Sequence, residues 1–309
     1  MAYYEAFFGA RDRLRAAYAE VLGAEMSDVS VTTATSEGIV RVLFGLDLRA
    51  GDEVLIAADE HPGLLGPLAA MRDRLGLTIR EVPLAQIAEA VTDETRLVAC
   101  SHVGWTTGEL APSLAGLPDD VPVLLDGAQG VGAVPVDLDA LGCSFYAGSG
   151  QKWLCGPAGT GMLWISPTWR ERLRAAGPTY FNLEVPADGL AARPHADGRA
   201  HDAISMSLET ASAALASLDV LAAFGWKHIH TQARSLSAEL AEGLRSAGRE
   251  VAPRGDTTLV SWRSNDAEAE AERLAAAGVV VRSFHGLPYV RASVGAWNNR
   301  ADVERLLAA

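Results

Sequence analysis

The stretch VPVLLDGAQGVGAVPVDLDALGCSFYAGSGQKWLCGPAGTGMLWI, residues 121–165, decides the fold. It holds three short apolar runs, at 121–126, 143–148 and 161–165, and a helical pattern at 136–141 between the first two. Short apolar strands separated by helices are typical of a largely parallel sheet that is covered by helices on both faces. Ligands of such sheets bind at the carboxyl ends of the strands, so we look for chemistry just after each run.

The same alternation extends to both sides of this stretch. Further strands are expected at 29–32, 53–57, 77–82 and 96–100, and helices at 3–22, 36–47, 63–75 and 84–90. Residues 166–204 look irregular, helical pattern resumes over 207–247, and strand-like runs then surround a helix at 266–277, before a last helix from Asn299. We therefore predict a large domain over residues 1–224 and a small C-terminal α/β domain over residues 225–309.

Composition excludes several classes of function. The 309 residues carry a formal net charge of −13, which argues against nucleic acid or an anionic membrane as a partner. No run approaches the 18 apolar residues of a membrane span. Three cysteines without a CxxC pair favour a reducing cytoplasm. His228 and His230 face different sides of a helix, so no metal site is expected.

Two strand ends carry an acid and a lysine. Asp126 closes the strand at 121–126, where a carboxylate is costly unless it meets an opposite charge or caps the next turn. Lys152 follows the next strand within a turn of glycines and small residues. A partly desolvated lysine becomes an amine nucleophile that can form a Schiff base. Taken alone, an ordinary surface lysine is the commoner interpretation.

Other strand ends add polar groups. Thr35 and Ser36 enter a helix, where hydroxyls and free N–H groups suit a phosphate or an ordinary N-cap. His61 follows another strand and can lie flat on an aromatic ligand. The glycine pattern around Lys152 matches neither a P-loop nor a dinucleotide motif. Hydroxyls, a histidine, an acid and a lysine together suggest pyridoxal 5′-phosphate (PLP), whose ring acts as an electron sink when its nitrogen is protonated.

The motifs TSEG, GDEVLIAADEHPG, SHVGWTTGEL, VLLDGAQGVG, SGQKWLCGPAGTG and VRASVGAWN stand in the order found in a known family. They resemble the class V aminotransferase family of fold-type I PLP-dependent enzymes over nearly the whole chain. That family includes cysteine desulfurases, isopenicillin-N-epimerase-like proteins and a C–S lyase of ergothioneine synthesis. The resemblance implies an α/β fold with a mostly parallel mixed sheet, a homodimer and an amino-acid substrate.

The resemblance also implies roles for individual residues. Lys152 would form the Schiff base, Asp126 would pair with the pyridine nitrogen, and His61 would stack on the ring. Gln129 would bind the ring hydroxyl, and Arg291 the substrate carboxylate. The phosphate would be held by a set of polar side chains: Thr35, Ser36, Ser149, Gln151 and, from a neighbouring subunit, Ser205.

Four features depart from the family pattern. Gln151 replaces the usual histidine, and Trp105 stands where desulfurases have an asparagine, so it should line a different substrate pocket. The segment VRSFHGLPYVRAS is short and has no cysteine, so a cysteine desulfurase is not expected, and Cys155 is interpreted as a packed thiol. The amino terminus is expected to be shorter than in family members.

The sequence therefore predicts a PLP-dependent enzyme that acts on an amino acid through Lys152. Aminotransferase chemistry is ranked first, as the family's default. The alternatives are a C–S or β-lyase and an epimerase, which differ only in where the proton or leaving group goes. A PLP-binding protein without turnover is the alternative of another class, motivated by the short amino terminus.

Overall fold

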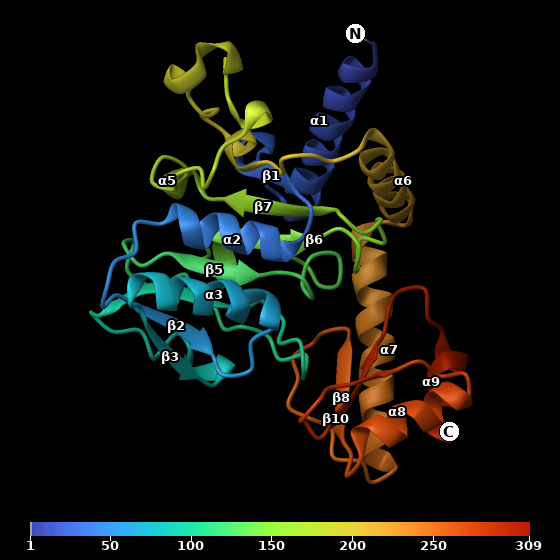
Figure 1. Cartoon of the computed structure of the whole chain (residues 1–309). Coiled ribbons are helices and arrows are strands. Elements are labelled where there is room, and N and C mark those ends of the chain that lie inside the picture. The colour runs from blue at the N-terminus through green and yellow to red at the C-terminus, as the bar shows by residue number, and fades with distance from the viewer. Residues whose placement is uncertain (1) are drawn as a thin grey trace.

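The computed structural model describes residues 2–309 and contains two separate sheets (Figure 1). The strands of the larger sheet are β1 (Val29–Thr32), β2 (Glu53–Ala57), β3 (Thr78–Val82), β4 (Thr95–Ser101), β5 (Val123–Asp126), β6 (Phe145–Ser149) and β7 (Gly161–Ile165). Their order is β1-β7-β6-β5-β4-β2-β3. Neighbours from β3 to β6 pair in parallel, whereas β7 is antiparallel to both β6 and β1. The sheet is mixed and mostly parallel, which confirms the predicted fold class.

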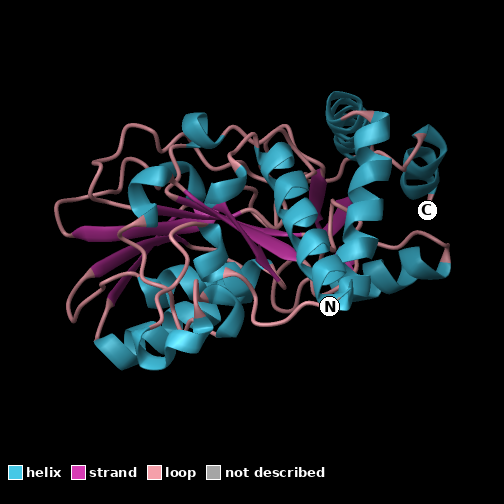
Figure 2. Ribbon diagram, turned by 90° about the horizontal axis from the view of Figure 1, so that it is seen from above, coloured by secondary structure: helices cyan, strands magenta, loops and turns pink. Residues whose placement is uncertain are grey.

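Helices cover both faces of this sheet (Figure 2). The helices of this part of the chain are α1 (Ala2–Leu22), α2 (Thr35–Gly45), α3 (Pro62–Leu75), α4 (Leu138–Leu141), α5 (Pro167–Arg170) and α6 (Leu208–Phe224). Side chains of a strand alternate between the two faces. Accordingly, Val54 and Ile56 of β2 belong to one buried cluster with apolar residues of α2 and α3. Leu55 and Ala57 belong to another, which includes residues of α1 and α6.

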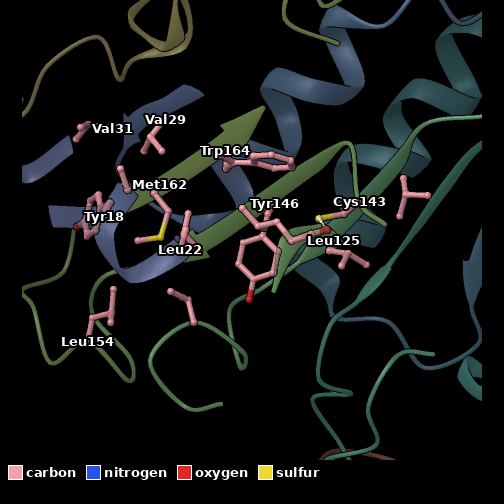
Figure 3. Close-up of a cluster of buried hydrophobic side chains, with 14 of the residues drawn as sticks. Tyr18, Leu22, Val29, Val31, Leu125, Cys143, Tyr146, Leu154, Met162 and Trp164 are labelled. Carbon is pink, nitrogen blue, oxygen red and sulfur yellow. Dashed lines mark hydrogen bonds between the residues drawn. The ribbon is translucent and has the colours of Figure 1, made fainter. Parts of the chain in front are cut away.

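The second cluster fixes the first helix against the sheet. Tyr18 and Leu22 of α1 are almost fully buried beside Met162 of β7 (Figure 3). Burying one such side chain contributes roughly 1.5–3 kcal/mol. The helix pattern predicted for residues 3–22 thus forms because its apolar stripe has a sheet face to cover.

The smaller sheet follows in the C-terminal part. Its elements are α7 (Trp226–Ser246), β8 (Leu259–Arg263), α8 (Ala267–Ala276), β9 (Arg282–Ser283), β10 (Tyr289–Ser293) and α9 (Arg300–Ala308). The strand order is β8-β10-β9, with both pairs antiparallel. Residues of α7, α8 and α9 join the sheet in a cluster of their own, which contains the buried Trp262.

Two predicted helices differ from the structure. The pattern at 84–90 forms only a 3₁₀ turn at Leu84–Gln86, because Leu84 and Ile87, three residues apart, both reach the core from a single turn. The pattern at 207–247 is two helices, broken at Gly225, which has a φ of 82°. The domain boundary placed after residue 224 stays a proposal, supported by the 80° bend at this glycine.

No single helix within residues 2–309 has both the length and the apolar composition to cross a bilayer. The bent pair α6 and α7 meets these criteria only when the two helices are counted together.

The strand directions bring distant parts of the chain to one edge. Strands β2, β4, β5 and β6 are parallel, so their carboxyl ends lie together. β1 is antiparallel to β7, which is antiparallel to β6, so β1 runs with β6. The turns that follow β1, β2, β4, β5 and β6 therefore meet at the same edge.

Candidate active site

A cavity of about 200 Å³ lies at this edge. All but one of the predicted site residues line it: Thr35, Ser36, His61, Trp105, Asp126, Gln129, Ser149, Gln151, Lys152 and Arg291. Ala34, Ala128 and Arg282 complete the lining. Residues that are more than 250 positions apart in sequence thus face one space.

Asp126 and Lys152, a carboxyl and an amine, both line the cavity. Asp126 is buried, and its Oδ1 accepts the Ala128 N–H at 2.9 Å. Burial raises the pKa of this carboxyl, which the Ala128 hydrogen bond and the charge of Lys152 oppose. Burial also lowers the pKa of the Lys152 amine, against the attraction of Asp126. A lysine with a lowered pKa is neutral, and so nucleophilic, in a larger fraction of molecules.

The start of α2 supplies hydroxyl groups. The Thr35 and Ser149 hydroxyl oxygens are 2.6 Å apart, and Ser36 lies in the first turn of the helix. A side chain at Gly63 would place its Cβ only 2.5 Å from the Ser36 hydroxyl, so glycine keeps this space open. Free N–H groups and the positive end of an 11-residue helix favour an anion at this point.

His61 is held in one orientation and one tautomer. Its Nδ1 accepts the Gly63 N–H at 2.9 Å, so the ring proton of the neutral form is on Nε2. Burial lowers the pKa of this imidazole. The ring meets Trp105 edge-on, with centroids 4.9 Å apart. A neutral, fixed imidazole is suited to lie against a flat ligand.

Two arginines reach the cavity from the smaller sheet. Arg291 of β10 and Arg282 of β9 are directly opposite in the strand register, and both guanidiniums lie over the Phe284 ring, at 5.2 and 5.6 Å. Arg291 donates to the Trp105 carbonyl oxygen, while its buried Nε has no hydrogen-bond partner. Burial, and secondarily Arg282, lowers the pKa of Arg291 to about 10. Like charges directly opposite on neighbouring strands are unfavourable unless an anion lies between them.

Sequence reasoning missed Arg282 as a binding residue. A signal was present, because VVVRSF and YVRASV are strand-like runs joined by a short turn, HGLP, at 285–288. Such runs pair as a hairpin, and the register then places Arg282 opposite Arg291.

Ser205 and Cys155 both lie outside the cavity lining. Ser205 is exposed in the loop before α6 and is not among the residues that line the cavity. Cys155 is exposed rather than packed, and its backbone has a φ of 54°, which side-chain-bearing residues rarely adopt. Cys100, in β4, and Cys143, two residues before β6, are both buried.

The donor set fits the predicted cofactor. The cavity lining combines hydroxyls at a helix N-terminus, which suit a phosphate, with a carboxyl, an amine and a fixed imidazole. The aminotransferase class-V model matches residues 5–306. The chain belongs to the class V aminotransferase family.

Individual relatives agree with this membership. A probable cysteine desulfurase of Pseudomonas aeruginosa is 31% identical over 92% of this chain and 77% of its own length. Isopenicillin N epimerase of Streptomyces clavuligerus is 31% identical over 52% of this chain and 44% of its own. A solved complex of the cystine C–S lyase C-DES with its reaction product cysteine persulfide covers all of this chain and 87% of that chain, with a TM-score of 0.92 and 26% identity.

The same comparisons confirm PLP as the cofactor of this family fold, since a C-DES variant carries glycine covalently linked to its PLP. They contradict the expectation that excluded a cysteine desulfurase, because relatives matched over nearly the whole chain bear that name. That expectation rested on one short segment without a cysteine, whereas the similarity covers the whole fold and the cavity. The names also favour C–S cleavage over the transamination that was ranked first.

Proposed function

We propose that this chain is a PLP-dependent lyase that cleaves the C–S bond of a sulfur-containing amino acid, with cystine as the first substrate to test. The choice of substrate rests on Arg282 and Arg291, which line the same cavity as Lys152. Cystine has two amino-acid carboxylates, one for each guanidinium. The similarity to cystine and cysteine C–S enzymes supports the choice of bond.

Different residues would bind different parts of PLP. Thr35, Ser36 and Ser149 would bind its phosphate, and Asp126 would hold a proton on its pyridine nitrogen. His61, neutral and fixed by Gly63, would cover one face of the ring. When bound, PLP supplies an electron sink for the electron pair released at the substrate Cα.

The chain's own residues then handle the substrate. Arg291 would orient the α-carboxylate, and Arg282 the distal one. The Lys152 amine would hold the cofactor before the substrate arrives and, once freed, would act as the base that removes the substrate's α-proton. Breakage of the Cβ–S bond sends the electron pair to sulfur. Overall, cystine and one water give cysteine persulfide, pyruvate and ammonia, with no external oxidant or reductant.

A product assay tests the proposal. The holoenzyme is incubated with cystine or with cysteine, and mass spectrometry measures pyruvate, alkylated persulfide and alanine, together with the keto acid formed when a 2-oxo acid is added. Pyruvate with persulfide from cystine supports the lyase. Alanine from cysteine identifies desulfuration, and a keto acid identifies transamination. Lys152→Ala should abolish every product and the covalent attachment of the cofactor that borohydride reduction fixes. If the wild type forms no product with any substrate, the chain is a PLP-binding protein without turnover.

We further propose a cytoplasmic homodimer. Ser205 stands exposed in the loop before α6, where it is accessible to the phosphate site of a second copy. Sedimentation of the holoenzyme gives the oligomeric state.

Ser205→Ala should weaken PLP binding in the dimer. An unchanged PLP affinity would show that Ser205 is not part of the phosphate site of the second copy.

A further inference from the structure

Trp153 follows Lys152 directly and does not line the cavity, yet it contacts a residue that does. Its indole Nε1–H donates to Oε1 of Gln129 at 2.9 Å. An indole nitrogen only donates, so its partner must be the oxygen of the amide. The hydrogen bond therefore fixes which end of the Gln129 amide faces Trp153, and it leaves the NH₂ end available to the cavity.

The indole itself is held on several sides. Trp153 is 7% exposed and packs in a small cluster with Val103, Val134 and Leu259, the last of which belongs to the smaller sheet. Trp297, from the turn after β10, stacks on it with centroids 5.9 Å apart and an angle of 28° between the rings. An indole packed in this way cannot turn its N–H away from Gln129 without losing contacts to these neighbours.

Gln129 is also fixed at its backbone. It lies in a tight turn after Asp126, in which the Gly130 and Val131 N–H groups both donate to the Gly127 carbonyl oxygen, at 2.9 and 3.0 Å. The turn thus fixes the backbone of Gln129, but it does not decide which end of the amide, oxygen or nitrogen, faces Trp153. The Trp153 hydrogen bond decides this.

We propose that Trp153 is a positioning residue, which orients the Gln129 amide so that its NH₂ group donates to an oxygen of the bound cofactor ring. The inference rests on the proposed function, since it requires PLP in the cavity. A ring oxygen that accepts hydrogen bonds is attracted by the NH₂ end of an amide and repelled by its carbonyl end. Through Trp297, the arrangement also ties the smaller sheet to the cofactor.

The test is a titration of the apoprotein with PLP, followed by absorbance, in Trp153→Phe, Gln129→Ala and the double variant. Phenylalanine keeps an aromatic ring but has no N–H. We expect Trp153→Phe to weaken PLP binding by about two- to tenfold, as for the loss of one hydrogen bond, and by less than about twofold when Gln129 is already alanine. The pH midpoint of the bound-cofactor absorbance should move in the same direction in both single variants.

Two further variants keep the result interpretable. Trp262→Phe is the matched control, because Trp262 also donates its indole N–H, to Glu270 at 2.9 Å, but lies in the core of the smaller sheet. It should leave PLP affinity unchanged. If Trp153→Phe does not fold, as judged by melting of the apoprotein, Trp297→Ala replaces it, with a smaller loss of affinity that again disappears in Gln129→Ala.

The outcomes separate the two proposals. Two results would overturn the positioning role while leaving PLP binding through Lys152 in the wild type. One is an unchanged PLP affinity in Trp153→Phe, or in Trp297→Ala where that variant replaces it. The other is a loss of affinity that persists in full when Gln129 is already alanine. A wild-type protein that binds no PLP overturns both the proposed function and this inference.

Discussion

Replacing Arg282 by glutamine should separate cystine from cysteine as substrates. Arg282 is exposed at the cavity, directly opposite Arg291, and no ion pair of Arg282 occurs within residues 2–309. Glutamine keeps the hydrogen-bonding end of the side chain and removes its charge. If Arg282 binds the second carboxylate of cystine, only the longer substrate loses a partner.

The structure sets the size of the effect. A hydrogen bond to a charged group contributes about 1.5–3 kcal/mol when desolvated, and solvent around Arg282 lowers this, so kcat/KM for cystine should fall about tenfold. Cysteine has no second carboxylate. Its anchor, Arg291, is buried and stays in place when Arg282 is replaced. The value for cysteine should therefore change by less than about twofold.

Steady-state pyruvate formation measures both substrates in the same assay. Arg291→Gln is the comparison variant, because it removes the anchor that both substrates share and should reduce kcat/KM for both by about tenfold or more. Most of the decrease in kcat/KM for cystine in Arg282→Gln should come from a higher KM. Equal losses for cystine and cysteine in Arg282→Gln would refute the assignment of a second carboxylate site.

Three predictions concern stability and use urea unfolding of the apoprotein. Glu60 is buried, and burial raises the pKa of its carboxyl from 4.5 to about 7. The free energy of unfolding of the wild type should therefore fall by about 3 kcal/mol relative to Glu60→Gln as pH rises from 4.5 through 7. A difference between the two proteins that does not change with pH would contradict this. Asp202→Asn leaves two buried arginines of α1 without their carboxylate and should cost about 3–5 kcal/mol; a loss below 1 kcal/mol would mean that the network is not stabilising. Gly127→Ala places a Cβ 2.2 Å from the Tyr146 ring and should cost at least about 1–3 kcal/mol, whereas an unchanged midpoint would show that the turn can move.

The sheet could be predicted from the sequence because local pattern and global fold agree there. All seven predicted strands of the larger sheet are present, with ends shifted by at most two residues, since each is a short apolar run bounded by turn residues. Their carboxyl ends then gave most of the site, because the side chains that follow parallel strands must meet at one edge. The roles assigned to those side chains remain proposals.

The misses share a different cause. Arg282 reaches the site through the pairing register of a hairpin, which two strand-like runs signal only once they are paired. The Trp153 hydrogen bond to Gln129 has no signal in the sequence. Gly225 breaks a long helical pattern where buried residues of α6 join the core of the larger sheet and buried residues of α7 join that of the smaller sheet. Helical periodicity continues through such a break, so only tertiary packing reveals it.

The two sheets make different contributions to the cavity. Asp126, Lys152 and the hydroxyls of α2 come from the larger sheet, whereas both arginines come from the smaller one. The loop after β4 joins them, since its carbonyl oxygens accept from Arg291 and, at Gly108, from Thr257 at 2.8 Å. In the proposed function, most residues that would hold the cofactor therefore come from the larger sheet, and the two arginines that would bind substrate carboxylates come from the smaller one. If the proposed roles hold, substitutions at Arg282 and Arg291 should change which amino acid binds while the cofactor residues of the larger sheet stay in place.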